Sequence, residues 1–247
     1  MNSAQRLARI GGVLYLLVAI FGAFAWEIVY ARMYAPGSSA ITAGNVIANS
    51  GLVRAGVVAD LFQATVFAFL GMTMYQLLKH VNKSAAAAMV VLVAIATAII
   101  CLNAVFELEG LRVATNHAYV TALGAAGSAA LVLTLLDIQH YGVLVAQIFF
   151  GLWLVPLGYL VYKSGWFPKA LGVTLIIGAA CYILDMLVQL ILPDLGAKAG
   201  TFIVLPSAIA EFWMLGYLLV FGVRSAPPAE RALIDRPGRP SIEAFTS

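Results

Sequence analysis

Six long apolar stretches separate the charged residues of this chain. A membrane-spanning helix needs about 20 mostly apolar residues, because the hydrocarbon core of a bilayer is about 30 Å thick. Only 10% of the 247 residues are charged, which is too few for the surface of a soluble domain of this size. We therefore predict an all-α polytopic membrane helix bundle with six spans: Ile10 to Tyr30, Leu52 to Leu78, Ala85 to Phe106, His140 to Tyr162, Ala170 to Leu192 and Phe202 to Val223.

A seventh apolar segment, residues 119–137, is rich in glycine and alanine, and the distribution of basic residues indicates how it is placed. Lysine and arginine favour the cytoplasmic side of a membrane. With six spans, ten of the 14 basic residues fall on one side, which we assign to the cytoplasm together with both termini. A seventh crossing would reverse that distribution, so we expect an interfacial or re-entrant helix on the outer face near 119–137. The ten are Arg6, Arg9, Lys79, Lys83, Lys163, Lys169, Arg224, Arg231, Arg236 and Arg239; the other four are Arg32, Arg54, Arg112 and Lys198.

The chain divides into a transmembrane helical domain over residues 1–224 and a tail over residues 225–247. The tail holds four prolines, mixed charges and few apolar residues, so we expect it to be disordered in the cytoplasm. The net charge of +3 is small and spread along the chain, and this excludes a nucleic-acid surface. The expected partner is the lipid bilayer of a plasma membrane; the sequence leaves the oligomeric state open.

Acidic residues inside the apolar stretches are the candidate functional groups, because an ionisable side chain in a spanning helix is costly and marks a functional site. Asp60, Asp185 and Glu211 lie roughly 10–14 Å inside their predicted spans. The polar residues gather toward the predicted outer side, which indicates one hydrated cavity opening outward. The candidate ligand- or ion-binding residues are Glu27, Arg54, Asp60, Glu107, His140, Gln147, Asp185 and Glu211, with Arg54 able to reach Glu27, Glu107 or Asp185.

Sequence motifs for metal, cofactor or nucleophilic chemistry are missing from this chain. No His-x-x-x-His or Glu-x-x-His pair of the kind that binds zinc on a helix is present. There is likewise no Gly-x-Ser-x-Gly turn and no phosphate-binding glycine loop. We therefore assign no metal ligand, expect no cofactor, and leave the catalytic residues unknown.

A run of residues in the second half resembles a known family. The run holds His140-Tyr141-Gly142, Phe149-Phe150-Gly151-Leu152 and Leu157-Gly158-Tyr159, followed by Tyr182, Asp185, Pro206 and Glu211; Gly56 to Asp60 adds a match in the second span. Together these resemble the bacterial membrane family catalogued as domain of unknown function 4386. The resemblance covers nearly all of the chain before the tail. It implies a bacterial integral membrane protein and brings no established activity.

Three functions fit these observations. The first is a membrane protein with an outward-facing acidic cavity that binds a small ligand or cation, which proton-coupled transport could then move. The second is an intramembrane enzyme acting on an outer-leaflet lipid or another lipophilic substrate, with one carboxylic acid as general acid and a second carboxylate as base. The third is a non-catalytic assembly or sensor subunit whose polar groups fix helix packing.

Overall fold

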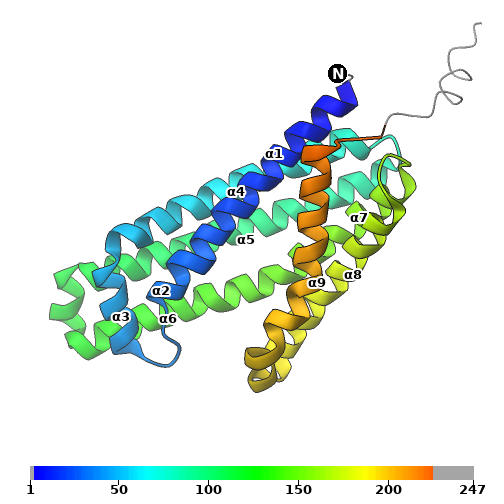
Figure 1. The fold of residues 1–247 in the computed structure, drawn as a ribbon. Helices are drawn as coiled ribbons and strands as arrows, with labels where there is room; N and C mark the ends of the chain where they lie inside the picture. The colour runs from blue at the N-terminus through cyan, green and yellow to red at the C-terminus, as the bar shows by residue number, and fades with distance from the viewer. Residues whose placement is uncertain (1–2, 225–247) are drawn as a thin grey trace, which may run out of the picture.

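The computed structural model describes residues 3–224, and every regular element in that range is a helix (Figure 1). The predicted tail at 225–247 lies outside the described residues. The elements are α1 (Ser3–Ala23), the π-helical turn η1 (Phe24–Tyr30), α2 (Ala31–Met33), α3 (Ser39–Ala48), α4 (Ser50–Leu78), α5 (Lys83–Thr115), α6 (His117–Leu152), α7 (Leu154–Lys163), α8 (Lys169–Ile191) and α9 (Pro193–Val220).

Six helical stretches are long and apolar enough to cross a membrane, which confirms the predicted all-helical, six-span architecture. The first joins α1, η1 and α2 over Ser3–Met33, and the fourth joins α6 and α7 over His117–Lys163. The remaining four are α4, α5, α8 and α9. The short helix α3 is apolar but too short to cross.

Residues 119–137 form the first half of α6 and run directly into the fourth span. The helix breaks only at Gly124, whose φ of 72° lies in the left-handed region that glycine adopts without strain. From Gly124 to the end of α6 the helix is about 40 Å long, which exceeds the hydrocarbon thickness. A kink at Gly124 therefore separates a short helical stretch from the long helix of span four, and residues 119–137 add no seventh span to the predicted six.

Both ends of the described chain meet at one end of the bundle, which we call the terminal end (Figure 1). The Gln5 side chain donates to Phe221 O at 2.8 Å, and Arg9 donates to Leu219 O. The turns at 79–82 and 164–168 lie at this end as well, where the His80 and Trp166 rings are 4.2 Å apart. The opposite, distal end carries the 34–49 segment, the turn at Asn116 and the turn at Leu192.

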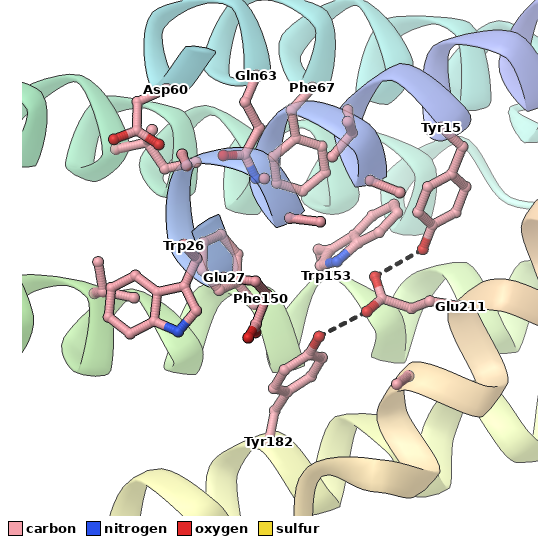
Figure 2. Close-up of a pocket in the computed structure, with 18 of the residues that line it drawn as sticks. Tyr15, Trp26, Glu27, Asp60, Gln63, Phe67, Phe150, Trp153, Tyr182 and Glu211 are labelled. Atoms are coloured by element: carbon pink, nitrogen blue, oxygen red, sulfur yellow. Dashed lines mark hydrogen bonds between the residues drawn. The ribbon is translucent and has the colours of Figure 1, made fainter. Parts of the chain in front are cut away.

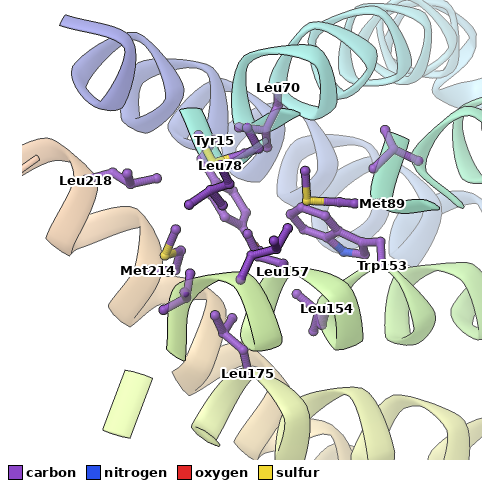
Figure 3. Packing of buried hydrophobic residues seen from close by; sticks show 14 of the residues in the cluster. Tyr15, Leu70, Leu78, Met89, Trp153, Leu154, Leu157, Leu175, Met214 and Leu218 are labelled. Atoms are coloured by element: carbon purple, nitrogen blue, oxygen red, sulfur yellow. The ribbon is translucent and has the colours of Figure 1, made fainter. Parts of the chain in front are cut away.

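The half of the bundle next to the terminal end, called the terminal half, contains most of the large apolar core (Figure 3). Side chains from α1, α4, α5, α7, α8 and α9 meet in it, and Leu157 at its centre is fully buried. Trp153 closes the core toward the middle of the bundle, with its ring 5.8 Å from Tyr15 and 5.2 Å from Phe67. Lipid tails are as apolar as these side chains, so the hydrophobic effect does not drive helices together inside a membrane. Close packing contacts of this kind hold them together instead.

Candidate functional site

A pocket of about 530 Å³ lies in the middle of the bundle, between α1, η1, α4, α5, α6, α8 and α9 (Figure 2). In Figure 1, α1 and α9 touch near the terminal end and move apart toward the distal end. The pocket walls are mainly apolar and aromatic, and none of the described residues lining it is a lysine, arginine or histidine. Its polar lining residues are Tyr15, Glu27, Asp60, Gln63, Asn103, Gln139, Tyr182 and Glu211.

Glu211 on α9 is held by two tyrosines from different helices (Figure 2). The Tyr15 hydroxyl of α1 donates to Oε1 at 2.8 Å, and the Tyr182 hydroxyl of α8 donates to Oε2 at 2.7 Å. Hydrogen bonds to an ionised carboxylate are the stronger kind, so this arrangement keeps a negative charge in place. The carboxyl group is fixed inside the pocket by these two hydroxyls, and no cationic side chain lies among the described residues that line the pocket with it.

Asp60 and Glu107 form a second acidic group toward the other end of the view in Figure 2, where Asp60 is labelled. Their carboxyl groups, on α4 and α5, lie close enough to interact with each other. Glu107 is only 3% exposed. A Cβ at Gly56 of α4 would lie 2.7 Å from Val29 Cγ1 and 3.1 Å from Glu107 Oε1, so the glycine lets both side chains pack against α4.

Two buried amides adjoin this acidic pair. Asn103 lies one turn before Glu107 on α5, and its side chain packs so closely on Gly142 of α6 that a Cβ there would lie 2.1 Å from Oδ1. Gln139 precedes Gly142 by one turn, and both amides line the pocket. Glu107 Oε1, Asn103 Nδ2 and Gln139 Oε1 are buried and have no hydrogen-bonding partner among the described residues.

Asp185 takes part in a separate contact between α6 and α8. Its Oδ2 accepts hydrogen bonds from Gln147 at 3.1 Å and from Gln189 at 2.7 Å. Asp185 is 2% exposed, and Gly200 of α9 makes room for its Oδ1. Neither Asp185 nor Gln147 lines the pocket, so these two predicted site residues form an interhelical hydrogen-bonded clip instead.

His140 lies within a group of stacked rings at the distal side of the pocket. Its imidazole is 5.4 Å from the Tyr34 ring, 6.0 Å from Tyr30 and 6.2 Å from Trp26. The Tyr34 hydroxyl donates to Asp137 Oδ1 at 2.5 Å. Burial, and then Asp137, raises the pKa of Tyr34 above its ordinary value, so its hydroxyl remains a donor at neutral pH.

The two remaining predicted site residues are exposed. Glu27 lines the pocket from η1, whose wide helical turn carries it and Trp26 to the pocket wall. Arg54 is exposed and forms no ion pair within residues 3–224, so the structure does not bring it to Glu27, Glu107 or Asp185. Three predicted residues thus line one pocket, namely Glu27, Asp60 and Glu211, and Glu107 joins them through Asp60.

The sequence reasoning missed several residues that define these contacts. Tyr15 was not singled out, because nothing in the sequence pairs a tyrosine on the first span with an acid on the sixth. Asp137 was hidden in the ambiguous segment. Within residues 3–224, no group of three or more histidine, cysteine, aspartate or glutamate side chains is arranged to hold a metal ion.

Comparison with known proteins identifies the family and little else. Over 68 residues, the chain is 37% identical to an uncharacterized protein of Archaeoglobus fulgidus, a match that covers 28% of this chain and 41% of the relative. No solved structure matches the chain. Residues 10–222 match the family described as Domain of unknown function (DUF4386), a region that holds five of the six spans whole, the first span from residue 10 onward, and every residue of the pocket. The chain is therefore a multi-pass membrane protein that belongs to the DUF4386 family.

Proposed function

We propose that the protein binds a small organic cation in the central pocket, with the Glu211 carboxylate as its counter-charge. One observation carries this proposal: Glu211 is fixed by two hydroxyl donors inside a pocket whose lining has acids and no base. A fixed charge in a membrane protein is expensive unless a partner offsets it. A cationic ligand supplies that partner.

The walls of the pocket favour an organic cation over a hydrated metal ion at Glu211. Trp26, Phe67, Phe150 and Trp153 all contribute to the lining. Aromatic faces attract cations and also bury apolar groups. A volume of about 530 Å³ lies in the usual range for small-molecule sites. An amphipathic ligand with one positive charge therefore matches both the shape and the chemistry.

The proposal includes the orientation of the pocket relative to the two sides of the membrane. Seven basic residues of the described chain lie at or beside the terminal end, and four lie toward the distal end. The positive-inside tendency then places the terminal end in the cytoplasm and lets the pocket open outward. Cysteines introduced at Lys198 and Lys83 test this: an impermeant thiol reagent added to whole cells should label the first and not the second.

Ligand binding is tested with purified protein in detergent and a series of quaternary ammonium ions, each paired with its uncharged carbon isostere. We expect the cations to raise the melting temperature and the isosteres to have little effect. Glu211→Gln should abolish the difference, while Asp194→Asn, an exposed acid on the same helix, should leave it intact. Equal stabilisation by the charged and the uncharged members would refute the assignment.

Proteoliposomes separate binding from transport and from catalysis. Uptake of a bound cation driven by a pH gradient, lost in Glu211→Gln, supports proton-coupled transport. Conversion of an added lipid into a new product, detected by mass spectrometry, supports the enzymatic alternative instead. Binding with neither effect leaves a sensor or assembly role.

A further inference from the structure

We propose that Asp60, Glu107, Asn103 and Gln139 form a second site, which binds a divalent metal cation of the calcium type. We call these four residues the carboxyl–amide cluster. The site is distinct from the organic-cation site, because Asp60 and Glu211 lie at different ends of the pocket view (Figure 2). The inference does not depend on what Glu211 binds.

Three helices bring the cluster together. Asp60 of α4 and Glu107 of α5 have interacting carboxyl groups. Asn103 and Glu107 are four residues apart on α5, so they share one face of that helix. The close approach of Asn103 to Gly142 brings α6 against that face, one turn away from Gln139. Asp60, Asn103 and Gln139 all face the pocket, so water and ions can reach the cluster from there.

Unmet hydrogen bonds show that protein atoms alone do not complete the cluster. Glu107, Asn103 and Gln139 are each at most 4% exposed, yet each has a buried polar atom without a partner among the described residues. Leaving such an atom unpaired costs about 1–3 kcal/mol, and more when the group is charged. Two of the three atoms are oxygens, Glu107 Oε1 and Gln139 Oε1. Rotating the Asn103 amide by 180° would present a third.

Charge balance favours a divalent ion over a monovalent one. With both carboxyl groups ionised, the pair would carry two negative charges, and repulsion between them in a buried site would be strong without a cation. Within the described residues, no basic side chain forms an ion pair with Asp60 or Glu107. The ion pair seen there joins Arg112 to Glu109 on the exposed side of α5. One divalent cation would neutralise both charges at once.

The donor atoms select the kind of metal. The cluster offers carboxylate and amide oxygens and contains no cysteine or histidine, which excludes a soft-metal site. Calcium accepts six to eight oxygen ligands in flexible geometry, including carboxylates, amide carbonyls and waters. Magnesium requires a tight octahedron, which is harder to build from side chains on three separate helices. Waters from the pocket would fill the remaining positions.

The test uses full-length protein in detergent after dialysis against a calcium chelator. Calorimetric titration with calcium chloride should give one site per chain, and calcium should raise the melting temperature by several degrees. Magnesium should bind at least tenfold more weakly. Glu107→Gln should weaken calcium binding at least tenfold, and Asp60→Asn should do the same while leaving the more buried acid in place.

Controls tie the effect to the cluster. Glu109→Gln alters a partly exposed acid on the same helix and should bind calcium like the wild type. Glu211→Gln should keep calcium and lose quaternary ammonium ions, whereas Glu107→Gln should do the reverse, so that the two proposals fail separately. If folded wild-type protein binds no calcium, or if sodium alone stabilises it, the proposal is overturned. A pH-dependent melting temperature that Glu107→Gln removes, without any metal effect, would overturn it too, by showing that the acids share a proton.

Discussion

The terminal and distal halves of the bundle are both built from long apolar helices, but they differ in the kind of side chain that those helices bury. The terminal half is packed with fully buried leucine and methionine side chains, and its helices approach one another closely at glycines. The fully buried polar side chains of the described residues all lie between the middle of the bundle and the distal end: Thr42, Asn103, Glu107, Ser128, Gln139, Asp185 and Ser207. The larger apolar cluster and the buried polar side chains therefore lie in different parts of the bundle.

This separation has a physical basis. Buried acids and amides are costly in hydrocarbon, so a fold that carries them must gain its packing energy elsewhere. A smaller apolar cluster around Leu111 and Leu136 packs the distal end, but the larger cluster, in the terminal half, supplies most of that energy. We therefore expect substitutions there to change stability, and substitutions in the distal half to change binding at a smaller cost in stability.

The largest effect should come from the centre of the terminal core. Leu157→Ala removes a fully buried side chain from α7, and the cavity left behind should lower the free energy of unfolding by about 2–5 kcal/mol. Unfolding in mixed detergent micelles measures this. Leu190→Ala is the matched control, because Leu190 is 49% exposed on α8, and should change stability by less than about 0.5 kcal/mol. Equal costs at the two sites would remove the contrast between the two halves.

The second effect concerns the close contact of α7 with α8. A Cβ added at Gly158 would lie 2.7 Å from Gly172 O, so Gly158→Ala must push the two helices apart. We expect a loss of about 1–3 kcal/mol, the usual cost of overpacking. Gly216→Ala has no atom within 4 Å to clash with and should be neutral or slightly stabilising. A Gly158→Ala variant as stable as wild type would mean that the hairpin is loosely packed.

The fold could be predicted from the sequence because lipid imposes a simple rule. Each span needs an apolar run, and the runs at Leu52 to Leu78 and Ala170 to Leu192 match α4 and α8 to within two residues. Residues 119–137 were harder to place, because hydropathy does not tell whether a helix continues through a glycine. The non-helical backbone of Gly124 interrupts the helix there, and a long helix resumes after it and continues to Leu152.

The candidate site could be predicted only in part. The sequence identifies Asp60, Glu107, Asp185 and Glu211 as candidates, because acidic residues are rare in apolar helices. Their partners depend on how far each helix is rotated about its axis, which the sequence does not record. Tyr15 reaches Glu211 across 196 residues, and Arg54 is exposed and forms no ion pair with any acid of the described chain.

The smallest effect belongs to the distal half, at the Asp185 clip. A double-mutant cycle of Gln147→Leu and Asp185→Ala isolates the hydrogen bond that joins α6 to α8, because each single change removes one partner of it. Its coupling energy should be about 0.6 kcal/mol and at most about 1.7, as for other interhelical hydrogen bonds in membranes. Gln189 keeps Asp185 partly satisfied in the single Gln147 variant, which limits the cost of that change. A coupling energy as large as the loss expected for Leu157→Ala would show that polar contacts, and not packing, hold the distal half together.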